Sequence, residues 1–212
     1  MTRLFDIVFS AVGLLVFSPL LVPLAVYIKL DSRGPVFYRQ ERVGRFGRTF
    51  WLYKFRSMQV DADKKGPLIT VGDADNRITR IGQFIRKYKL DELPQLINVL
   101  KGEMSIVGPR PEVKKYVKHY TDEQRKVLDI RPGITDIASI VYKNENELLQ
   151  AQRDPEKYYI KVIMPHKLTL NKVYISAPNL KNYFYIIYLT GREVFRGKPK
   201  APVPELKRYE LN

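Results

Sequence analysis

Residues 7–28 read IVFSAVGLLVFSPLLVPLAVYI and carry no charged side chain. At a rise of 1.5 Å per residue, a helix over this stretch would be about 33 Å long, enough to cross the hydrocarbon core of a bilayer. A cleaved signal peptide is not expected, because the apolar run is too long and lacks a small-residue cleavage site before Lys29. Residues 1–30 therefore form a predicted membrane segment.

Two features bear on whether this helix crosses the bilayer or enters and leaves on one side. Ser18 and Pro19 lie at the centre of the run, and proline bends a helix because it removes a backbone donor and clashes with the preceding turn. A nearby serine hydroxyl can satisfy the carbonyl that the proline leaves unbonded. Arg3 and Lys29 flank the run, and the positive-inside tendency would keep both ends cytoplasmic. A re-entrant helix broken at Ser18-Pro19 and a kinked signal anchor both fit these residues.

The composition of the chain restricts its chemistry. It has 212 residues and no cysteine, which suits one compact domain beside the membrane segment and excludes disulfides, thiolate nucleophiles and cysteine-bound metals. The formal net charge of +15 indicates an anionic partner, either nucleic acid, anionic lipid or a phosphorylated substrate. The apolar N-terminus favours the last two, and no nucleic-acid partner is expected because no nucleic-acid motif accompanies the scattered basic residues.

The predicted domain, residues 31–196, is of the α+β class and mainly helical, and a tail follows at 197–212. Periodicity, caps and charge predict helices over residues 78–88, 91–101, 112–128, 154–174 and 179–195. The aromatic run Thr49–Arg56 suits a strand. The last of these helices is aromatic over much of its surface, so it could lie either in the membrane interface or in the core of the domain.

Residues 86–112, RKYKLDELPQLINVLKGEMSIVGPRPE, set two adjacent carboxylates among basic groups. Asp91 and Glu92 could simply start a helix, because Asp is a preferred N-cap and Glu in the first turn complements the helix dipole. The same helix N-terminus attracts phosphate, and a carboxylate there can attack phosphorus once cations offset the repulsion. Spacing alone leaves both interpretations open.

Basic residues that could serve such a phosphate site lie on both sides of the acidic pair. Arg86 precedes Asp91 by five residues, and Arg110 lies between two prolines, which limit the entropy lost in positioning its guanidinium. Lys54 and Arg56 follow a basic stretch that either is a solvated loop near anionic lipid headgroups or binds substrate directly. Magnesium suits a site with few carboxylates, since water and phosphates supply its other ligands.

Several stretches in a fixed order make the chain resemble the bacterial sugar transferases, which are small monotopic phosphoglycosyl transferases acting on polyprenol phosphate. The resemblance runs over nearly the whole chain and includes the N-terminal segment with Ser18-Pro19. The other stretches are GPVFYRQERVGRFGRTFWLYKFRSM, LDELPQLINVLKGEMSIVGPRPE, DIRPGIT and DPEKYYIKVIMPHKL. No single stretch is specific to this family, but the order and spacing of all of them together are.

The resemblance implies a re-entrant helix broken at Ser18-Pro19, on the cytoplasmic face of the bacterial inner membrane. It implies that Asp91 is the nucleophile, that Glu92 is a general acid/base or a positioning group, and that Mg²⁺ binds at Asp91. The implied reaction moves a phospho-sugar from a UDP-sugar to undecaprenyl phosphate in two steps. UMP leaves first, giving a sugar-phosphoryl-Asp91 intermediate, and the lipid phosphate then attacks it. The product would start a bacterial glycan such as an exopolysaccharide, O-antigen, capsule or glycoprotein.

The resemblance also covers basic residues of the proposed site, and the chain departs from the family pattern at two places. Lys54, Arg86 and Arg110 match basic positions of the family motifs and are expected to bind phosphate or nucleotide. Arg56 and Arg131 are added to this substrate-binding set. Where the family usually continues RPGIT with Gly-Leu, this chain has Asp136 and Ile137, and this carboxylate either alters substrate contacts or caps a local turn. The residues after Tyr174, SAPNLKNYF, are also atypical.

Two alternatives stay open on the sequence. The chain could be a non-catalytic, membrane-anchored basic scaffold for anionic lipids or glycan-assembly partners, in which Asp91 and Glu92 would be dispensable. It could also be a phosphotransferase with another nucleotide donor. The identity of the sugar is not readable, because a difference of one hydroxyl or acetamido group depends on pocket shape.

Overall fold

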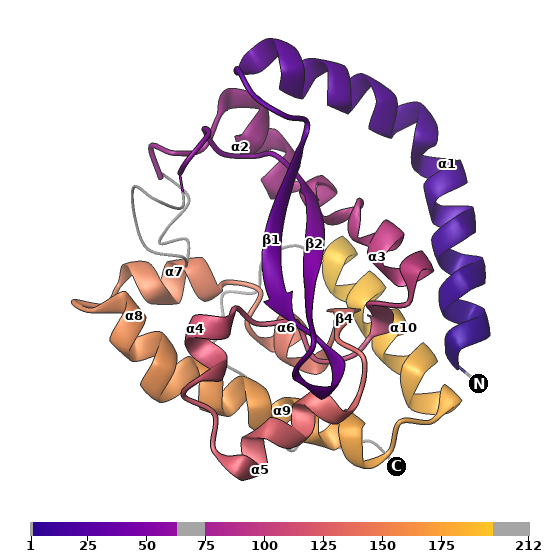
Figure 1. Cartoon of the computed structure of the whole chain (residues 1–212), viewed down its shortest axis with the longest axis vertical. Coiled ribbons are helices and arrows are strands. Elements are labelled where there is room, and N and C mark those ends of the chain that lie inside the picture. Colours follow the sequence, from indigo (N-terminus) through magenta and orange to yellow (C-terminus); the bar gives the residue numbers. More distant parts are fainter. Residues whose placement is uncertain (1, 63–74, 197–212) are drawn as a thin grey trace.

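A computed structural model describes residues 2–62 and 75–196 (Figure 1). They form one long N-terminal helix, two small two-stranded sheets and a series of shorter helices. The excess of helix over sheet confirms the predicted α+β, mainly helical class. The predicted tail, 197–212, lies outside the described residues.

The first helix, α1 (Thr2–Asp31), contains the whole apolar stretch and both of its prolines. Pro19 has no N–H to donate to the carbonyl of Leu15, and the Ser18 hydroxyl donates to that carbonyl instead at 2.7 Å. This confirms the predicted role of the serine beside the proline. The helix stays continuous through Ser18-Pro19, so the predicted break is not seen as an interruption, and Figure 1 shows the helix curving around one side of the domain.

The N-terminal end of α1 is tied to the domain by buried polar contacts. The Arg3 guanidinium donates to the carbonyls of Val99 and Leu100 at 2.6 and 2.9 Å, in the last turn of the helix that ends at Lys101. Asp6 is 1% exposed. Its carboxylate accepts three hydrogen bonds of 2.9 Å, from the Ser105 hydroxyl, the Ile106 N–H and the Tyr183 hydroxyl.

One face of the C-terminal end of the same helix packs on the same domain. Leu24 and Ile28 pack in one apolar cluster with Phe55 and Ile85. Between the two ends, the helix exposes apolar side chains at Val12, Leu15, Val16, Phe17, Leu20 and Val22. Both ends of α1 therefore rest on one body, and between them Gly13 lies against Leu96 of the same body while the opposite face of the helix stays exposed.

The strands β1 (Phe37–Val43) and β2 (Thr49–Phe55) form an antiparallel hairpin that runs from the Phe37–Phe55 pair to the Val43–Thr49 pair. The turn η1 (Arg45–Gly47) joins them, and Gly47 adopts a φ of +73° that favours glycine. The predicted strand at 49–56 is confirmed to within one residue. The basic residues before it belong to a paired strand and a tight turn.

The acidic pair follows α2 (Arg80–Lys87), whose position confirms the predicted helix at 78–88. The predicted helix at 91–101 is divided. Its first part is the 3₁₀ turn η2 (Leu90–Glu92), and its second is α3 (Gln95–Lys101), which begins after Pro94. The prediction that Asp91 caps this helix is wrong, because Pro94 occupies the position before its first turn.

The strands β3 (Ser105–Val107) and β4 (Gly133–Thr135) pair in parallel and bring two of the sequence motifs together. A Cβ on Gly133 would lie 2.1 Å from the backbone nitrogen of Gly108. Only glycine allows the two backbones to approach this closely. The Gly108-Pro109-Arg110-Pro111 loop is therefore supported directly by the RPGIT segment.

The C-terminal half builds the largest apolar cluster, to which α6, α9 and α10 contribute. Its elements are α4 (Lys114–Val117), α5 (Asp122–Arg125), η3 (Lys126–Asp129), α6 (Ile137–Val141), α7 (Glu145–Gln150), α8 (Pro155–Tyr158), the π-helical turn η4 (Tyr159–Ile163), α9 (Met164–Ser176) and α10 (Leu180–Arg196). The predicted helix at 112–128 is broken because Thr121 starts a new helix with its own capping box. The helices predicted at 154–174 and 179–195 are confirmed, the first as α8, η4 and α9 in succession.

Candidate active site

The acidic pair lies in a turn whose entry is strained. Lys89 precedes η2 with a φ of +58°, in the left-handed region that costs a residue with a side chain about 1–2 kcal/mol. This residue lies between α2 and the turn that holds Asp91 and Glu92. Backbone strain of this kind concentrates at functional sites, where the surrounding structure holds it in place.

Glu92 is held by two basic side chains from distant parts of the chain. Arg110 donates from Nη1 to Oε2 at 3.0 Å and from Nη2 to Oε1, and Lys54 Nζ donates to Oε1 at 3.1 Å. The Arg110 pair has the bidentate geometry in which the guanidinium is strongest and most directional. The structure therefore brings Lys54 and Arg110 together at the acidic pair, and their binding of phosphate or nucleotide stays a prediction.

Lys54 reaches the site from β2, and the hairpin is fixed to α3 by a buried amide. Asn98, fully buried in α3, accepts from the Tyr53 N–H at 3.0 Å and donates to the Trp51 carbonyl at 2.7 Å. These bonds follow the edge of β2 just before Lys54. The lysine is thereby held on a rigid strand.

The backbone of the proline-flanked loop is held from one side by Asp136. This carboxylate is 2% exposed, and its Oδ2 accepts from the Arg110 N–H at 2.9 Å and from Asn171 Nδ2 at 2.9 Å. Its Oδ1 accepts from the Ser139 N–H at 2.5 Å and caps α6. Of the two roles considered for Asp136, the cap is confirmed, and the contact with Arg110 was not predicted.

Arg42 holds the same loop from the other side and was missed in the sequence. It donates from Nη1 to the Pro111 carbonyl at 3.0 Å and to Glu112 Oε1 at 3.3 Å. Glu112 also accepts a hydrogen bond from the Tyr159 hydroxyl. Arg42 lies opposite Phe50 and shares a hairpin face with Lys54, so period-two spacing along the two strands could have indicated it.

The two carboxyl groups differ in environment and in pKa. Burial raises the pKa of Asp91 above its ordinary value, although Lys54 opposes the shift, and so more weakly do Arg86 and Lys89. Burial acts on Glu92 in the same direction, but Arg110 and Lys54 outweigh it and hold the pKa of Glu92 well below its usual range. Adjacent acids whose pKa values are pushed apart are typical of catalytic pairs.

The two carboxylates also differ in the number of hydrogen bonds that they accept. Within the described part of the chain, no hydrogen bond or ion pair is found for the Asp91 side chain, which is 8% exposed. Glu92, in contrast, already accepts three hydrogen bonds. Asp91 is thus a buried carboxylate that lies near the positive charges of Lys54, Arg86 and Lys89.

The remaining predicted binding residues fall into two groups. Arg86 lies in the last turn of α2, and its positive charge is one of those that oppose the rise in the pKa of Asp91. Arg56 is 4% exposed and donates to the carbonyls of Ile28, Ser32 and Arg33 at 2.6–3.0 Å, at the end of α1. Arg131 donates from Nε to the Gly102 carbonyl at 3.0 Å. These bonds anchor the fold, and a substrate role for the last two arginines stays a prediction.

The donor set of the site suits a weakly held divalent cation. Among residues 2–62 and 75–196, no group of three or more His, Asp or Glu side chains is arranged to bind a metal. Asp91 would supply one oxygen, since Glu92 is already paired. Mg²⁺ fits such a set, because it keeps several waters and takes further oxygens from the phosphates of a substrate.

A sequence model of the bacterial sugar transferase family matches residues 1–197. The chain is 42% identical over 163 residues to the UDP-N-acetylgalactosamine-undecaprenyl-phosphate N-acetylgalactosaminephosphotransferase of Aeromonas hydrophila, which covers 74% of this chain and 38% of that protein. It is 38% identical over 170 residues to the UDP-glucose:undecaprenyl-phosphate glucose-1-phosphate transferase of Xanthomonas campestris pv. campestris, which covers 78% of this chain and 35% of that protein.

A shorter relative matches over a larger share of its own length. The uncharacterised sugar transferase EpsL of Bacillus subtilis is 42% identical over 142 residues, which cover 67% of this chain and 69% of that protein. The chain therefore spans little more than a third of the two longer relatives and about two thirds of the shorter one.

Proposed function

Because the chain belongs to the bacterial sugar transferase family, we propose that it transfers a phospho-sugar from a UDP-sugar to undecaprenyl phosphate and releases UMP. The names of the Aeromonas and Xanthomonas relatives contain this acceptor and a UDP-sugar. The observation that carries the proposal is the uncommitted, buried Asp91 carboxylate beside the Glu92–Arg110–Lys54 cluster. The product would start a bacterial surface glycan.

In the first step, an Asp91 carboxylate oxygen attacks the phosphorus that carries the sugar. A bond forms between that oxygen and phosphorus, and the bond to the bridging oxygen of the diphosphate breaks, so that UMP leaves with the electron pair. The enzyme then holds a sugar-phosphoryl-aspartate. In the second step, a phosphate oxygen of the lipid attacks the same phosphorus, which restores the Asp91 carboxylate and forms a lipid diphosphate sugar.

The cations at Glu92 supply the charge that this chemistry needs. Phosphoryl transfer depends mainly on positioning and on stabilising negative charge at the phosphate oxygens. Arg110 and Lys54 are held in place by Glu92 and can share their remaining donors with the phosphates of the donor. The depressed pKa of Glu92 keeps it an anion, which favours the positioning role over that of a general acid.

Mg²⁺ would bind through Asp91 and neutralise charge on the donor diphosphate. Arg86 and Lys89 add positive charge around the same carboxylate. Together they reduce the repulsion between an aspartate and a phosphate that approach each other. The Asp91 carboxylate can then approach the phosphorus at neutral pH although both groups are negatively charged.

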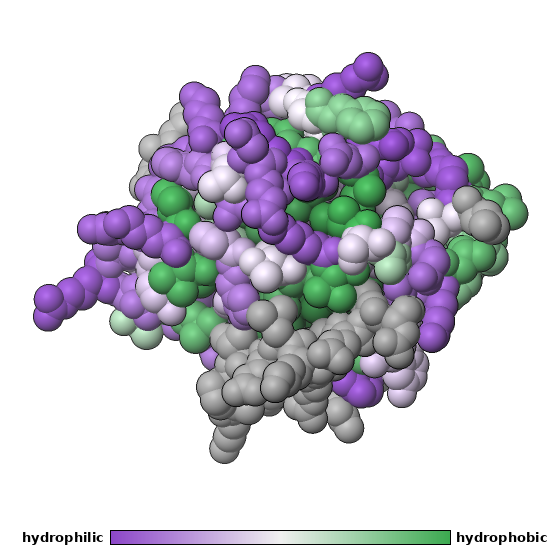
Figure 2. All heavy atoms as spheres, turned by 90° about the horizontal axis from the view of Figure 1, so that it is seen from below, coloured by the Kyte–Doolittle hydropathy of each residue, from purple (hydrophilic) through white to green (hydrophobic). Residues whose placement is uncertain are grey.

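We further propose that α1 is re-entrant and that the domain lies on the cytoplasmic face of the inner membrane. A helix that crosses the bilayer carries its ends to opposite sides, whereas Asp6 and Ile28 contact the same domain. The exposed apolar middle of α1 would enter the lipid. In Figure 2, some of the exposed apolar side chains lie at the right edge, the side on which α1 runs in Figure 1.

The experiment for this function is UMP release from a panel of UDP-sugars, with detergent-purified protein, Mg²⁺ and undecaprenyl phosphate. Wild type, Asp91→Asn and the control Asp122→Asn are compared. We expect release by the wild type and by the control, whose aspartate is exposed in the first turn of α5, but not by Asp91→Asn. Release by Asp91→Asn equal to that of the wild type would contradict the proposal, and no release with any donor would favour a non-catalytic scaffold.

A further inference from the structure

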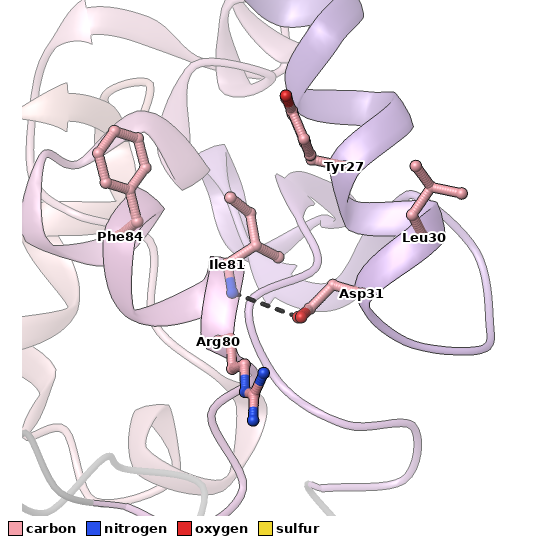
Figure 3. A pocket seen from close by; sticks show the side chains of 6 residues that line it. All are labelled: Tyr27, Leu30, Asp31, Arg80, Ile81 and Phe84. Atoms are coloured by element: carbon pink, nitrogen blue, oxygen red, sulfur yellow. Dashed lines mark hydrogen bonds between the residues drawn. The ribbon is translucent and has the colours of Figure 1, made fainter.

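A groove opens between the end of α1 and the start of α2, at the far end of α2 from the acidic pair (Figure 3). Its volume is about 600 Å³. Its lining is mostly apolar and consists of Tyr27, Leu30, Asp31, Arg80, Ile81 and Phe84. Asp31 joins α1 to α2, because its carboxylate accepts a hydrogen bond from the Ile81 N–H at 3.2 Å.

A second hollow of about 410 Å³ adjoins this groove and is more polar. The two share Asp31 and Arg80. The second is completed by Ser32, Gln59, Ile78 and Thr79. A polar and an apolar compartment therefore meet at one carboxylate and one guanidinium.

The charges at this junction are opposite and open to a ligand. Arg80 is exposed, and no hydrogen bond or ion pair is found for its guanidinium within the described part of the chain. Asp31 uses one oxygen for the Ile81 N–H. A ligand that carries both a phosphate and an ammonium group would match this pair, since each charge would meet its opposite.

The apolar compartment is continuous with the surface of α1 that the proposed function places in lipid. Leu30 is 76% exposed, Tyr27 60% and Phe84 48%. Soluble proteins rarely leave such side chains together without a partner. An occupant that comes from the bilayer would reach the groove along α1 without crossing water.

We propose that this groove binds a zwitterionic aminophospholipid of the membrane. The lipid phosphate meets Arg80, the ammonium meets Asp31, and an acyl chain lies along Tyr27, Ile81 and Phe84. The site anchors the end of α1 and the start of α2 to the bilayer surface. This inference rests on the membrane placement proposed above.

The lipid acceptor of the reaction fits this groove less well than a phospholipid does. A polyprenyl phosphate ends at its phosphate and has no cation for Asp31 or for the polar hollow. The eight residues of α2 also separate Arg80 from the acidic turn by about 12 Å of helix. A phosphate at Arg80 is therefore distant from the Asp91 nucleophile.

The test is native mass spectrometry of the full chain in detergent, titrated with phosphatidylethanolamine, phosphatidylglycerol or undecaprenyl phosphate. We expect one phosphatidylethanolamine to bind more tightly than phosphatidylglycerol. Arg80→Gln should weaken it about tenfold or more, because a hydrogen bond to a charged group is lost. Arg125→Gln, which removes an exposed cation of α5, should leave binding unchanged.

Asp31→Asn keeps an oxygen for the Ile81 N–H but removes the charge, so we expect it to abolish the preference for phosphatidylethanolamine over phosphatidylglycerol. Equal binding by wild type and Arg80→Gln would overturn the site. Equal binding of the two phospholipids by the wild type would overturn the headgroup assignment. If undecaprenyl phosphate binds at Arg80 more tightly than phosphatidylethanolamine does, the assignment of the groove to an aminophospholipid is contradicted.

A separate readout distinguishes this inference from the proposed function. Arg80→Gln should form UMP from a UDP-sugar in a single turnover as the wild type does, since Arg80 lies outside the acidic site. If the wild type binds phosphatidylethanolamine at Arg80 but forms no UMP with any donor, the proposed enzyme function is contradicted and the lipid site is supported. If UMP forms but no lipid binds at Arg80, only the proposed lipid site is contradicted.

Discussion

The Arg110 guanidinium donates two hydrogen bonds to the Glu92 carboxylate, which lies 18 positions earlier in the sequence. The loop that carries Arg110 is held at its backbone on both sides, by Asp136 at the Arg110 N–H and by Arg42 at the Pro111 carbonyl. Neither the side chain nor the backbone of Arg110 therefore has to be ordered when a phosphate arrives. Groups held in this way stabilise developing charge without a cost of reorganisation.

Replacing Arg110 should impair the donor half of the reaction. We expect Arg110→Ala to lower the rate of UMP formation about 10²–10³-fold, the loss typical when one preorganised donor is removed. Arg110→Lys should recover only part of the rate, because lysine cannot form the bidentate pair. Single-turnover UMP formation measures both, with Arg125→Ala as the exposed-arginine control. A rate for Arg110→Ala within twofold of wild type would remove Arg110 from the site.

Asp136 should act as a positioning residue for Arg110. Asp136→Asn has one acceptor oxygen for three donors, so at least one hydrogen bond is lost and folding stability falls by about 1–3 kcal/mol. We expect KM for the UDP-sugar to rise as well, because the Arg110 backbone is released. Asp154→Asn is the matched control, since Asp154 caps α8 without contacting Arg110. If both variants lose stability and neither changes KM, Asp136 is only a cap.

The shifted pKa values predict opposite effects of neutralising the two acids. The pKa of Asp91 is raised in the folded state, so its ionised form costs stability at pH values above that pKa. Asp91→Asn should therefore be more stable than wild type at pH 7, and the difference should shrink as the pH falls toward 3.8, the unperturbed value.

The pKa of Glu92 is lowered, so its charge contributes stability above the unperturbed value of 4.5, and this contribution is lost as the pH falls through the folded-state pKa. Glu92→Gln should therefore be less stable than wild type at pH 7 and should approach it in acid. Thermal unfolding of the three proteins in detergent between pH 3 and 7 measures both effects. The same sign of change for both variants at pH 7 would contradict the electrostatic account of the pair.

The topology of α1 can be measured directly, because the chain has no cysteine. Thr2→Cys and Arg33→Cys place single thiols at the two ends of the helix. A re-entrant helix predicts that a membrane-impermeant maleimide labels neither in intact spheroplasts and both after permeabilisation. Labelling of residue 2 but not of residue 33 in intact spheroplasts would show a spanning helix.

Local patterns were sufficient to predict the elements whose causes are local. The apolar run and Pro19 predicted α1, together with the hydroxyl that satisfies the Leu15 carbonyl. The aromatic run predicted β2, and helical spacing predicted α2. The start of α3 was misplaced because Asp91 is a good cap in general, whereas here Pro94 sets the first turn.

The parts of the site that escaped prediction depend on contacts between distant segments. Asp136 meets Arg110 only because β3 and β4 pair and bring Gly108 against Gly133. Arg56 lies in a basic motif of the hairpin, yet its donors go to the carbonyls at the end of α1. Charge and spacing do not distinguish an arginine that binds phosphate from one that caps a helix.

The most direct test of the central claim is the intact mass of the protein after incubation with UDP-sugar and Mg²⁺ in the absence of lipid acceptor. The account predicts a mass increase of one phospho-sugar on the wild type, located on Asp91 by peptide mapping and removed when undecaprenyl phosphate is added. Asp91→Asn should show no increase. Formation of lipid diphosphate sugar by the wild type without any such adduct, or with the adduct on another residue, would contradict the account.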